Sequence, residues 1–127
     1  MMDRQLQQTI TYAQERRQFG RPIGKNQAIS HRIADMKIRL ESARLLLYHA
    51  CWRMARGENA VLEVSMAKVA ISEAAQQSSL AALQIHGGVA FSPELGIERM
   101  LRDSVPSTLF SGTSEIQRDL IALELGL

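Results

Sequence analysis

The chain has 127 residues, enough for one domain with a single hydrophobic core. Hydrophobic residues make up 46% and charged residues 22%, a globular composition that excludes a disordered or collagen-like chain. With 15 Lys and Arg against 13 Asp and Glu, the net charge is +2, which is too small to indicate a nucleic-acid partner.

One cysteine, Cys51, excludes a disulfide framework and favours a reducing compartment, so we expect a cytoplasmic protein. No apolar run approaches the roughly 20 residues that span a bilayer, and the first residues lack the apolar core of a signal peptide. His31, His49 and His86 are far apart and show no metal-ligand spacing, so no metal site is expected.

Three helices are predicted in the first two thirds of the chain. Leu6, Ile10 and Ala13 share one face of a helix that runs toward Arg17. Two glycine-free stretches follow, and each predicts one long helix. The apolar residues of the first stretch alternate at steps of four and three, as in a helix packed along its length: Ile29, Ile33, Met36, Leu40, Ala43, Leu47, Ala50 and Met54. Gly57 predicts the end of this helix, and Asn59 is expected to cap the next one.

The second long helix is rich in alanine and serine, so its neighbours are expected to approach closely, and Gly87 and Gly88 end it. Ser92 and Pro93 predict a further short turn of helix, and Ser114 with Gln117 predicts a capping box at the start of a last helix. No segment alternates with period two, so no strand is predicted. The expected fold is all-α: one domain, residues 1–127, forming an up-and-down four-helix bundle with an additional C-terminal helix.

A basic, glycine-containing corner lies between Glu15 and Arg32. Arginine side chains at such a corner suit a phosphate or pyrophosphate, although a solvated basic helix end explains the same pattern. Phe19 in this corner either stacks on a ligand ring or plugs the loop into the core, and the residues alone favour the plug.

Two further segments combine glycine with a helix end. In Gln84-Ile85-His86-Gly87-Gly88, bare backbone offers close approach to a ligand, but a C-cap explains the glycines without any ligand and is the interpretation that the spacing alone favours. The segment 111–115 leads into a helix N-terminus, where free N–H groups favour an anion, and capping alone also explains it.

These motifs, in this order and spacing, resemble the C-terminal helical domain of the acyl-CoA dehydrogenase family over essentially the whole chain. The resemblance lies in YAQERRQFG at 12–20, QAI at 27–29, ADM at 34–36, QIHGG at 84–88, LRD at 101–103 and GTSEIQR at 112–118. It implies a flavoenzyme that oxidises the α,β-bond of an acyl thioester, on acyl-CoA or a carrier protein. An N-terminal helical domain and a middle β-domain of the parent would then lie outside this chain. It also implies FAD as cofactor, a homodimer or homotetramer, and an electron-transfer flavoprotein as electron acceptor.

The resemblance also assigns roles to individual residues. Arg16 resembles the arginine that meets the FAD pyrophosphate, Phe19 the aromatic beside the cofactor, and Gln27 a further flavin contact. The loop that closes on the FAD of a neighbouring subunit is matched by Gln84, Ile85, His86, Gly87 and Gly88. The helix start that holds FAD within the same subunit is matched by Thr113, Ser114 and Glu115.

Ser111 departs from the family pattern, because many members carry the catalytic glutamate at this position. A serine hydroxyl has no basicity near neutral pH. Isovaleryl-type members also lack glutamate here and supply it from a helix upstream of this segment. Two hypotheses follow: an enzyme whose base lies before Met1, or a non-catalytic helical scaffold, or divergent flavoprotein, of the same fold.

Overall fold

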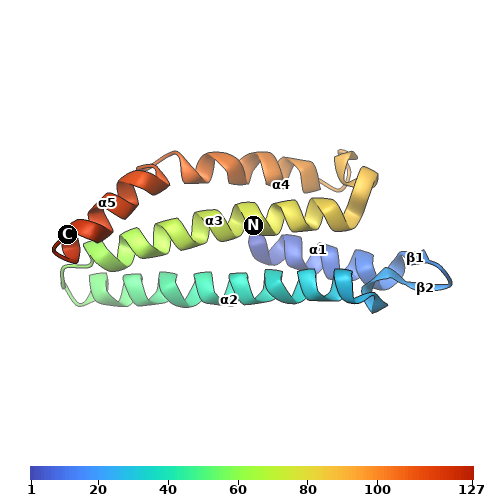
Figure 1. The fold of residues 1–127 in the computed structure, drawn as a ribbon, viewed down its shortest axis with the longest axis horizontal. Helices are drawn as coiled ribbons and strands as arrows, with labels where there is room; N and C mark the ends of the chain where they lie inside the picture. Colours follow the sequence, from blue (N-terminus) through green and yellow to red (C-terminus); the bar gives the residue numbers. More distant parts are fainter.

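The computed structural model describes residues 1–127 and is built from five α-helices (Figure 1). In chain order the elements are α1 (Met2–Glu15), β1 (Arg17–Gln18), β2 (Arg21–Pro22), α2 (Gln27–Ala55), α3 (Val61–His86), α4 (Ile97–Ser104) and α5 (Ser114–Glu124). Short 3-10 helices lie at Ile23–Lys25, Gly87–Phe91 and Val105–Thr108. None of the helices combines the length and hydropathy required of a transmembrane segment.

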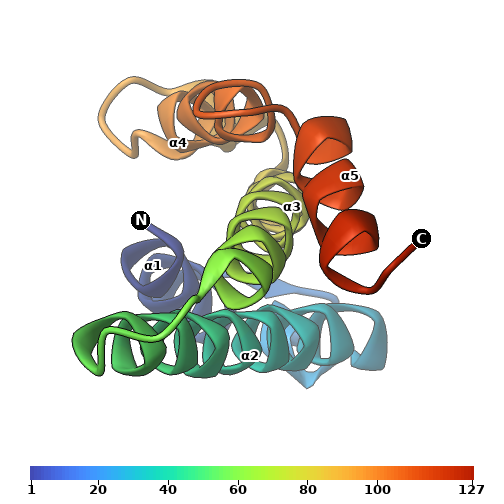
Figure 2. The ribbon, with the colours of Figure 1, turned by 90° about the vertical axis from the view of Figure 1, so that its left-hand side faces the viewer.

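Helix α3 is the central helix of the bundle. The other four helices lie around it, and the first four helices alternate in direction along the long axis (Figures 1 and 2). Its buried positions are mostly alanine and serine, including Ala67, Ala75 and Ala82. Small side chains let four neighbours approach one helix, so the predicted up-and-down bundle with an additional C-terminal helix is confirmed.

The core lies where α1, α2, α3 and α4 meet. Its buried residues are Met2, Leu6, Met36, Leu40, Ala75, Ala82, Ile85, Ala90 and Ile97. The apolar stripe predicted for α2 is buried at Met36 and Leu40, but Leu47 and Met54 remain 44% and 60% exposed. Helix α1 runs beside only the half of α2 nearer the start of α2 (Figure 1), so the other half of α2 has less cover.

The expectation of no strand is wrong at one place. Residues 17–22 form a small antiparallel hairpin in which Arg17 pairs with Pro22 and Gln18 with Arg21. Strands of two residues are too short to show a period-two pattern. The turn requires positive φ at both of its central residues, Phe19 (53°) and Gly20 (79°), as in the tightest hairpins.

The predicted helix ends are only partly correct. Gly57 does follow the end of α2 with φ 71°. Ala60, not Asn59, occupies the cap position of α3, although the Asn59 side-chain oxygen accepts a hydrogen bond from the Val61 amide at 3.2 Å. Helix α4 begins at Ile97, after Gly96, and not at the predicted Ser92–Pro93, which lie in a turn.

Candidate functional site

One end of the bundle gathers three of the predicted cofactor segments. The β1–β2 hairpin, the start of α2 and the end of α3 all lie at the right-hand end in Figure 1. The residues brought together are Arg16 and Phe19 on the hairpin side, Gln27 as the first residue of α2, and Gln84 to Gly88 at the end of α3. We call this region the basic end.

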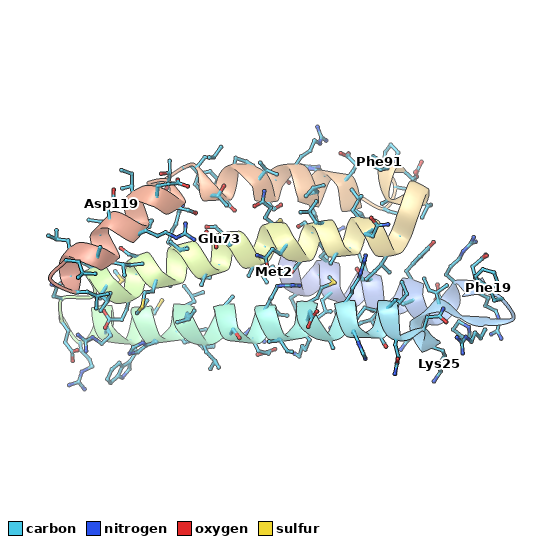
Figure 3. The ribbon with its side chains drawn as sticks, viewed as in Figure 1. Met2, Phe19, Lys25, Glu73, Phe91 and Asp119 are labelled. Atoms are coloured by element: carbon cyan, nitrogen blue, oxygen red, sulfur yellow. The ribbon has the colours of Figure 1, made fainter.

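Phe19 does not plug the core, which corrects the interpretation favoured by the residues alone. Its side chain is 98% exposed at the tip of the hairpin, pointing away from the bundle (Figure 3). Phenylalanine at φ 53° pays a conformational cost that an asparagine or glycine would avoid. The Phe19 ring gains no packing within the chain, so an exposed aromatic ring in this turn fits contact with a ligand or another chain.

Arg16 leaves α1 with an extended backbone and presents a free guanidinium. Its N–H donates to the Tyr12 carbonyl and its carbonyl accepts from the Ile23 N–H, both at 2.8 Å. Its exposed side chain makes no ion pair or hydrogen bond within the chain, whereas the Arg21 side chain donates to Asn26 at 2.5 Å. A guanidinium held by its backbone and free at its tip is ready to bind an anion such as a pyrophosphate.

Gly87 and Gly88, at the end of α3, differ in whether the backbone conformation requires glycine. Gly87 caps the helix through its N–H to the Leu83 carbonyl and has φ 65° and ψ −147°, a conformation open to glycine alone. A Cβ on Gly88 would meet nothing within 4 Å and Gly88 has no positive φ, so the chain itself does not require glycine there. Ile85 and His86 are buried, while Gln84 is exposed. The C-cap interpretation is therefore confirmed for Gly87, and Gly88 leaves open backbone at the surface.

The start of α5 forms a second, separate place. Thr113 is its N-cap and accepts a hydrogen bond from the Ile116 amide at 3.3 Å. The capping box predicted from Ser114 is wrong, because Ser114 is already helical and buried. Gln117 does not reach back to a cap residue and donates from Nε2 to the Ser111 carbonyl at 3.2 Å.

Glu115 is a poor candidate for a proton acceptor. Its own backbone amide and, next, the Thr113 hydroxyl hydrogen-bond the carboxylate and hold the pKa of Glu115 below its ordinary value. A general base works best with a pKa near the working pH, and these hydrogen bonds move Glu115 away from it.

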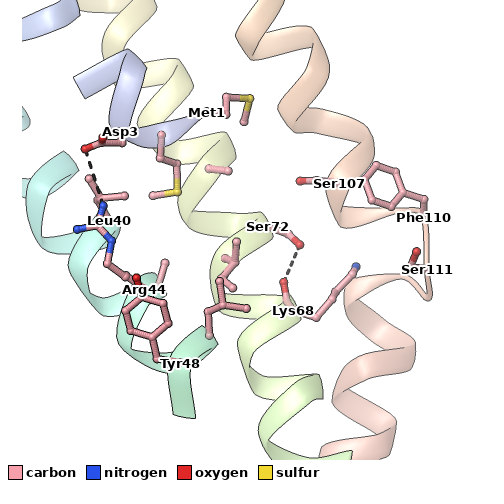
Figure 4. Close-up of a pocket in the computed structure, with 15 residues that line it drawn as sticks. Met1, Asp3, Leu40, Arg44, Tyr48, Lys68, Ser72, Ser107, Phe110 and Ser111 are labelled. Carbon is pink, nitrogen blue, oxygen red and sulfur yellow. Dashed lines mark hydrogen bonds and ion pairs between the residues drawn. The ribbon is translucent and has the colours of Figure 1, made fainter. Parts of the chain in front are cut away.

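Ser111 faces an apolar groove of about 590 Å³ between α1, α2, α3 and the loop before α5 (Figure 4). Ser111 and Gly112 form a turn with φ 55° and 85°. The groove is lined by Met1, Met2, Asp3, Leu40, Ala43, Arg44, Leu47, Tyr48, Lys68, Ile71, Ser72, Ala75, Ser107, Phe110 and Ser111.

The charged residues that line the groove differ in whether they have a partner. Asp3 and Arg44 approach each other at 3.9 Å, whereas the Lys68 ammonium is buried without a hydrogen-bond partner. Lys68 extends from α3 toward the loop that carries Phe110 and Ser111 (Figure 4). Sequence patterns missed this groove, because its residues come from separate helices and loops and share no local pattern.

The two places are well separated in one copy of the chain. The ion pair between Arg118 and Glu73, at 2.5 Å, sets the start of α5 beside the middle of α3. Gln84 lies 11 residues further along α3, about 17 Å at 1.5 Å per residue. Arg16 and Gln84 therefore share one end, and Thr113 to Glu115 do not join them. No group of three or more His, Cys, Asp or Glu residues is placed to hold a metal ion.

Known proteins match this chain along nearly its whole length. The family model for the acyl-CoA dehydrogenase C-terminal domain matches residues 1–126. An L-prolyl-[peptidyl-carrier protein] dehydrogenase of Pseudomonas fluorescens is 58% identical over 127 residues, which cover 100% of this chain and 33% of that protein.

Two solved structures show the same fold. The FAD complex of PigA has a TM-score of 0.97 and 49% identity, with 99% of this chain and 33% of that one covered. Butyryl-CoA dehydrogenase from Megasphaera elsdenii has a TM-score of 0.96 and 32% identity, with the same coverage of 99% and 33%. The chain thus spans about a third of the length of these relatives. The chain belongs to the acyl-CoA dehydrogenase family, whose C-terminal domain it matches along nearly its whole length.

Proposed function

We propose that this chain is the C-terminal domain of an enzyme that oxidises the α,β-bond of an acyl thioester with FAD. Residues 1–127 form the helical bundle, and an N-terminal helical domain and a middle β-domain complete the parent. One observation carries the proposal: the fold brings the free Arg16 guanidinium, the exposed Phe19 ring and the Gln84 to Gly88 segment to one end.

The residues at the basic end fit the cofactor. FAD offers a pyrophosphate for Arg16, flat rings for Phe19, and a dinucleotide surface against which Gly88 needs no side chain. Gln27 and Gln84 are exposed and add neutral donors and acceptors. The side chains of Ile85 and His86 are buried, so they anchor the segment in the bundle, and only their backbone groups are proposed to reach the cofactor. When bound, FAD supplies the acceptor for the hydride that leaves the β-carbon.

Two copies of the chain complete each cofactor site. Arg118 of α5 pairs with Glu73, which lies about 17 Å along α3 from Gln84. We therefore propose that one copy meets one FAD with the start of α5 and another FAD with the basic end. At the start of α5, Thr113 caps the Ile116 amide, and the positive end of the helix dipole favours an anion there. We therefore propose a homodimer or homotetramer.

The outer face of α2 is the interface that we propose between copies. Ile38, Leu45 and Trp52 are 62%, 68% and 54% exposed and stand seven residues apart, opposite the buried face of the helix. This row is symmetric about Leu45. Two α2 helices packed antiparallel would set Leu45 against its counterpart and Ile38 against Trp52, the self-complementary contact that a two-fold interface requires. Exposed apolar rows of this kind mark association sites.

The substrate proposal follows from the groove and the relatives. An apolar groove of about 590 Å³ beside Ser111 suits an acyl group. The 58% identical relative is named for prolyl groups on a peptidyl carrier protein, so we propose a carrier-bound acyl thioester, with the prolyl thioester as first candidate. Electrons then pass to an electron-transfer flavoprotein. The exposed free thiol of Cys51 suits a reducing compartment such as the cytoplasm.

The catalytic base is proposed to lie upstream of Met1. Ser111 has no basicity, and Glu115 is held as a carboxylate with a lowered pKa. Ser111 lies on the groove wall with an exposed, short side chain, which leaves room for a glutamate from a preceding helix to reach the α-carbon. A parent without such a glutamate would favour the scaffold hypothesis.

The test uses the full-length protein that contains this chain. We expect it to purify yellow, and Arg16→Ala to weaken FAD binding by about one to two decades, since a charge-assisted contact contributes about 1.5–3 kcal/mol. Arg99→Ala is the matched control, because Arg99 is exposed on α4 and contacts Asp103 at 3.8 Å. Equal FAD affinities of the two variants would remove Arg16 from the site. Reduction of the flavin by prolyl-carrier protein, compared with acyl-CoA, then tests the substrate class.

A further inference from the structure

One residue near the end of α1, Tyr12, contacts both the end of α3 and the backbone of Arg16. Its ring stacks on the His86 ring with centroids 4.4 Å apart and an angle of 23° between the planes. Its hydroxyl donates to the His86 carbonyl at 3.3 Å, and its own carbonyl accepts from the Arg16 N–H at 2.8 Å. Tyr12 and His86 are 74 residues apart in sequence. Tyr12 therefore contacts both segments that are proposed to bind FAD, the end of α3 through its side chain and Arg16 through its backbone.

The His86 side of this contact is rigid. His86 is 5% exposed, and its Nδ1 lies 2.8 Å from the Ala82 carbonyl. A carbonyl only accepts, so Nδ1 carries the proton and the ring orientation is set. The His86 carbonyl belongs to the last turn of α3, where carbonyls have no partner within the helix. The Tyr12 hydroxyl satisfies it and thereby orients the peptide that leads into Gly87 and Gly88.

The Arg16 side is anchored in the same way. Arg16 is the first residue after α1, and its backbone turns away from the helix at φ −66° and ψ 123°. Its N–H to the Tyr12 carbonyl and its carbonyl to Ile23 fix the point from which the guanidinium extends. A shift of Tyr12 would therefore move Arg16 relative to the glycine segment.

We propose that Tyr12 is a positioning residue for the cofactor, which sets the distance between the Arg16 guanidinium and the backbone of Gly87 and Gly88. This inference rests on the proposed function, because it assumes that both segments bind one FAD. The competing explanation is that the Tyr12 and His86 rings pack as core side chains with no effect on the ligand. Tyr12→Phe separates the two, since it keeps the ring stack and removes only the hydroxyl.

The experiment measures the FAD dissociation constant and the apoprotein melting temperature of the full-length protein. Four proteins are compared: wild type, Tyr12→Phe, Arg16→Ala and the double variant. We expect Tyr12→Phe to weaken FAD about three- to tenfold, the range for one hydrogen bond, and Arg16→Ala to cost less in the Tyr12→Phe background than in wild type. Thr108→Val is the control, because it removes one hydroxyl that donates to a carbonyl, that of Val105 at 3.0 Å, and Thr108 belongs neither to the basic end nor to the groove.

The outcomes separate this inference from the proposed function. If Tyr12→Phe changes only the melting temperature while Arg16→Ala still weakens FAD, Tyr12 is a core residue and the positioning role is refuted. Additive effects of the two substitutions would refute it too. If neither substitution changes FAD affinity, the proposed cofactor role of the basic end fails as a whole. His86→Phe, which keeps an aromatic ring but loses Nδ1, provides a second variant and is expected to weaken FAD in the same direction as Tyr12→Phe.

Discussion

The turn that places Ser111 on the groove depends on Gly112, and Gly112→Ala tests this. Gly112 has φ 85°, and a Cβ there would lie 2.6 Å from Gln117 Nε2. That amide donates to the Ser111 carbonyl at 3.2 Å, so the new methyl group would displace the bond that holds the turn. The substitution therefore combines a backbone penalty with the loss of a specific hydrogen bond.

The expected magnitude follows from these two parts. A left-handed backbone costs a residue with a Cβ about 1–2 kcal/mol, and the lost hydrogen bond about 0.5–1.5 kcal/mol. Gly112→Ala is therefore expected to lower the free energy of unfolding by about 1.5–3.5 kcal/mol. Gly57→Ala is the matched control, because Gly57 has φ 71° and a Cβ there would meet nothing within 4 Å. It carries the backbone penalty alone.

Urea unfolding followed by circular dichroism measures the difference between the two variants. We expect Gly112→Ala to cost about 0.5–1.5 kcal/mol more than Gly57→Ala. In a Gln117→Ala background this excess is expected to disappear, because no amide is left to displace. Equal costs of the two glycine substitutions would refute the reasoning that Gln117 holds the Ser111 turn.

Three further outcomes are expected. Ser111→Ala in the full-length protein is expected to keep nearly all flavin reduction by substrate, whereas replacing the upstream glutamate is expected to lose about 10²–10⁴-fold; loss of reduction in Ser111→Ala with FAD still bound would contradict this. Because the pKa of Glu115 is lowered, its carboxylate stabilises the folded protein above the ordinary pKa of 4.5, and this stabilisation is lost as pH falls through the lower folded pKa. Glu115→Gln is therefore expected to make the free energy of unfolding depend less on pH below about pH 5. Leu45→Lys is expected to reduce self-association in sedimentation experiments, while Gln7→Lys on exposed α1 surface leaves it unchanged.

The helical parts of the fold could be predicted from the sequence because the information is local. Steps of four and three between apolar residues such as Met36, Leu40 and Ala43 describe one face of one helix. Gly57 ends that helix by its own conformational freedom. The Gly87 cap could be predicted for the same reason. The hairpin at 17–22 was missed, since two-residue strands carry no periodic signal.

The candidate site required the tertiary structure, because its parts are far apart in the chain. Phe19 reads as a core aromatic until the fold leaves it 98% exposed, and no local pattern couples Tyr12 to His86. The groove beside Ser111 likewise exists only once α1, α2 and α3 are packed.

Periodicity, glycine positions and motif order thus settle the helices and the family, because each depends on neighbours within a few turns or on residue identity alone. The exposure of Phe19, the grouping of Arg16 with Gly88 and the distance to Thr113 depend on how far α1 and α3 extend and which helix covers which. These are properties of packing between residues some 70 to 100 positions apart, and burial of apolar surface across the whole bundle determines them.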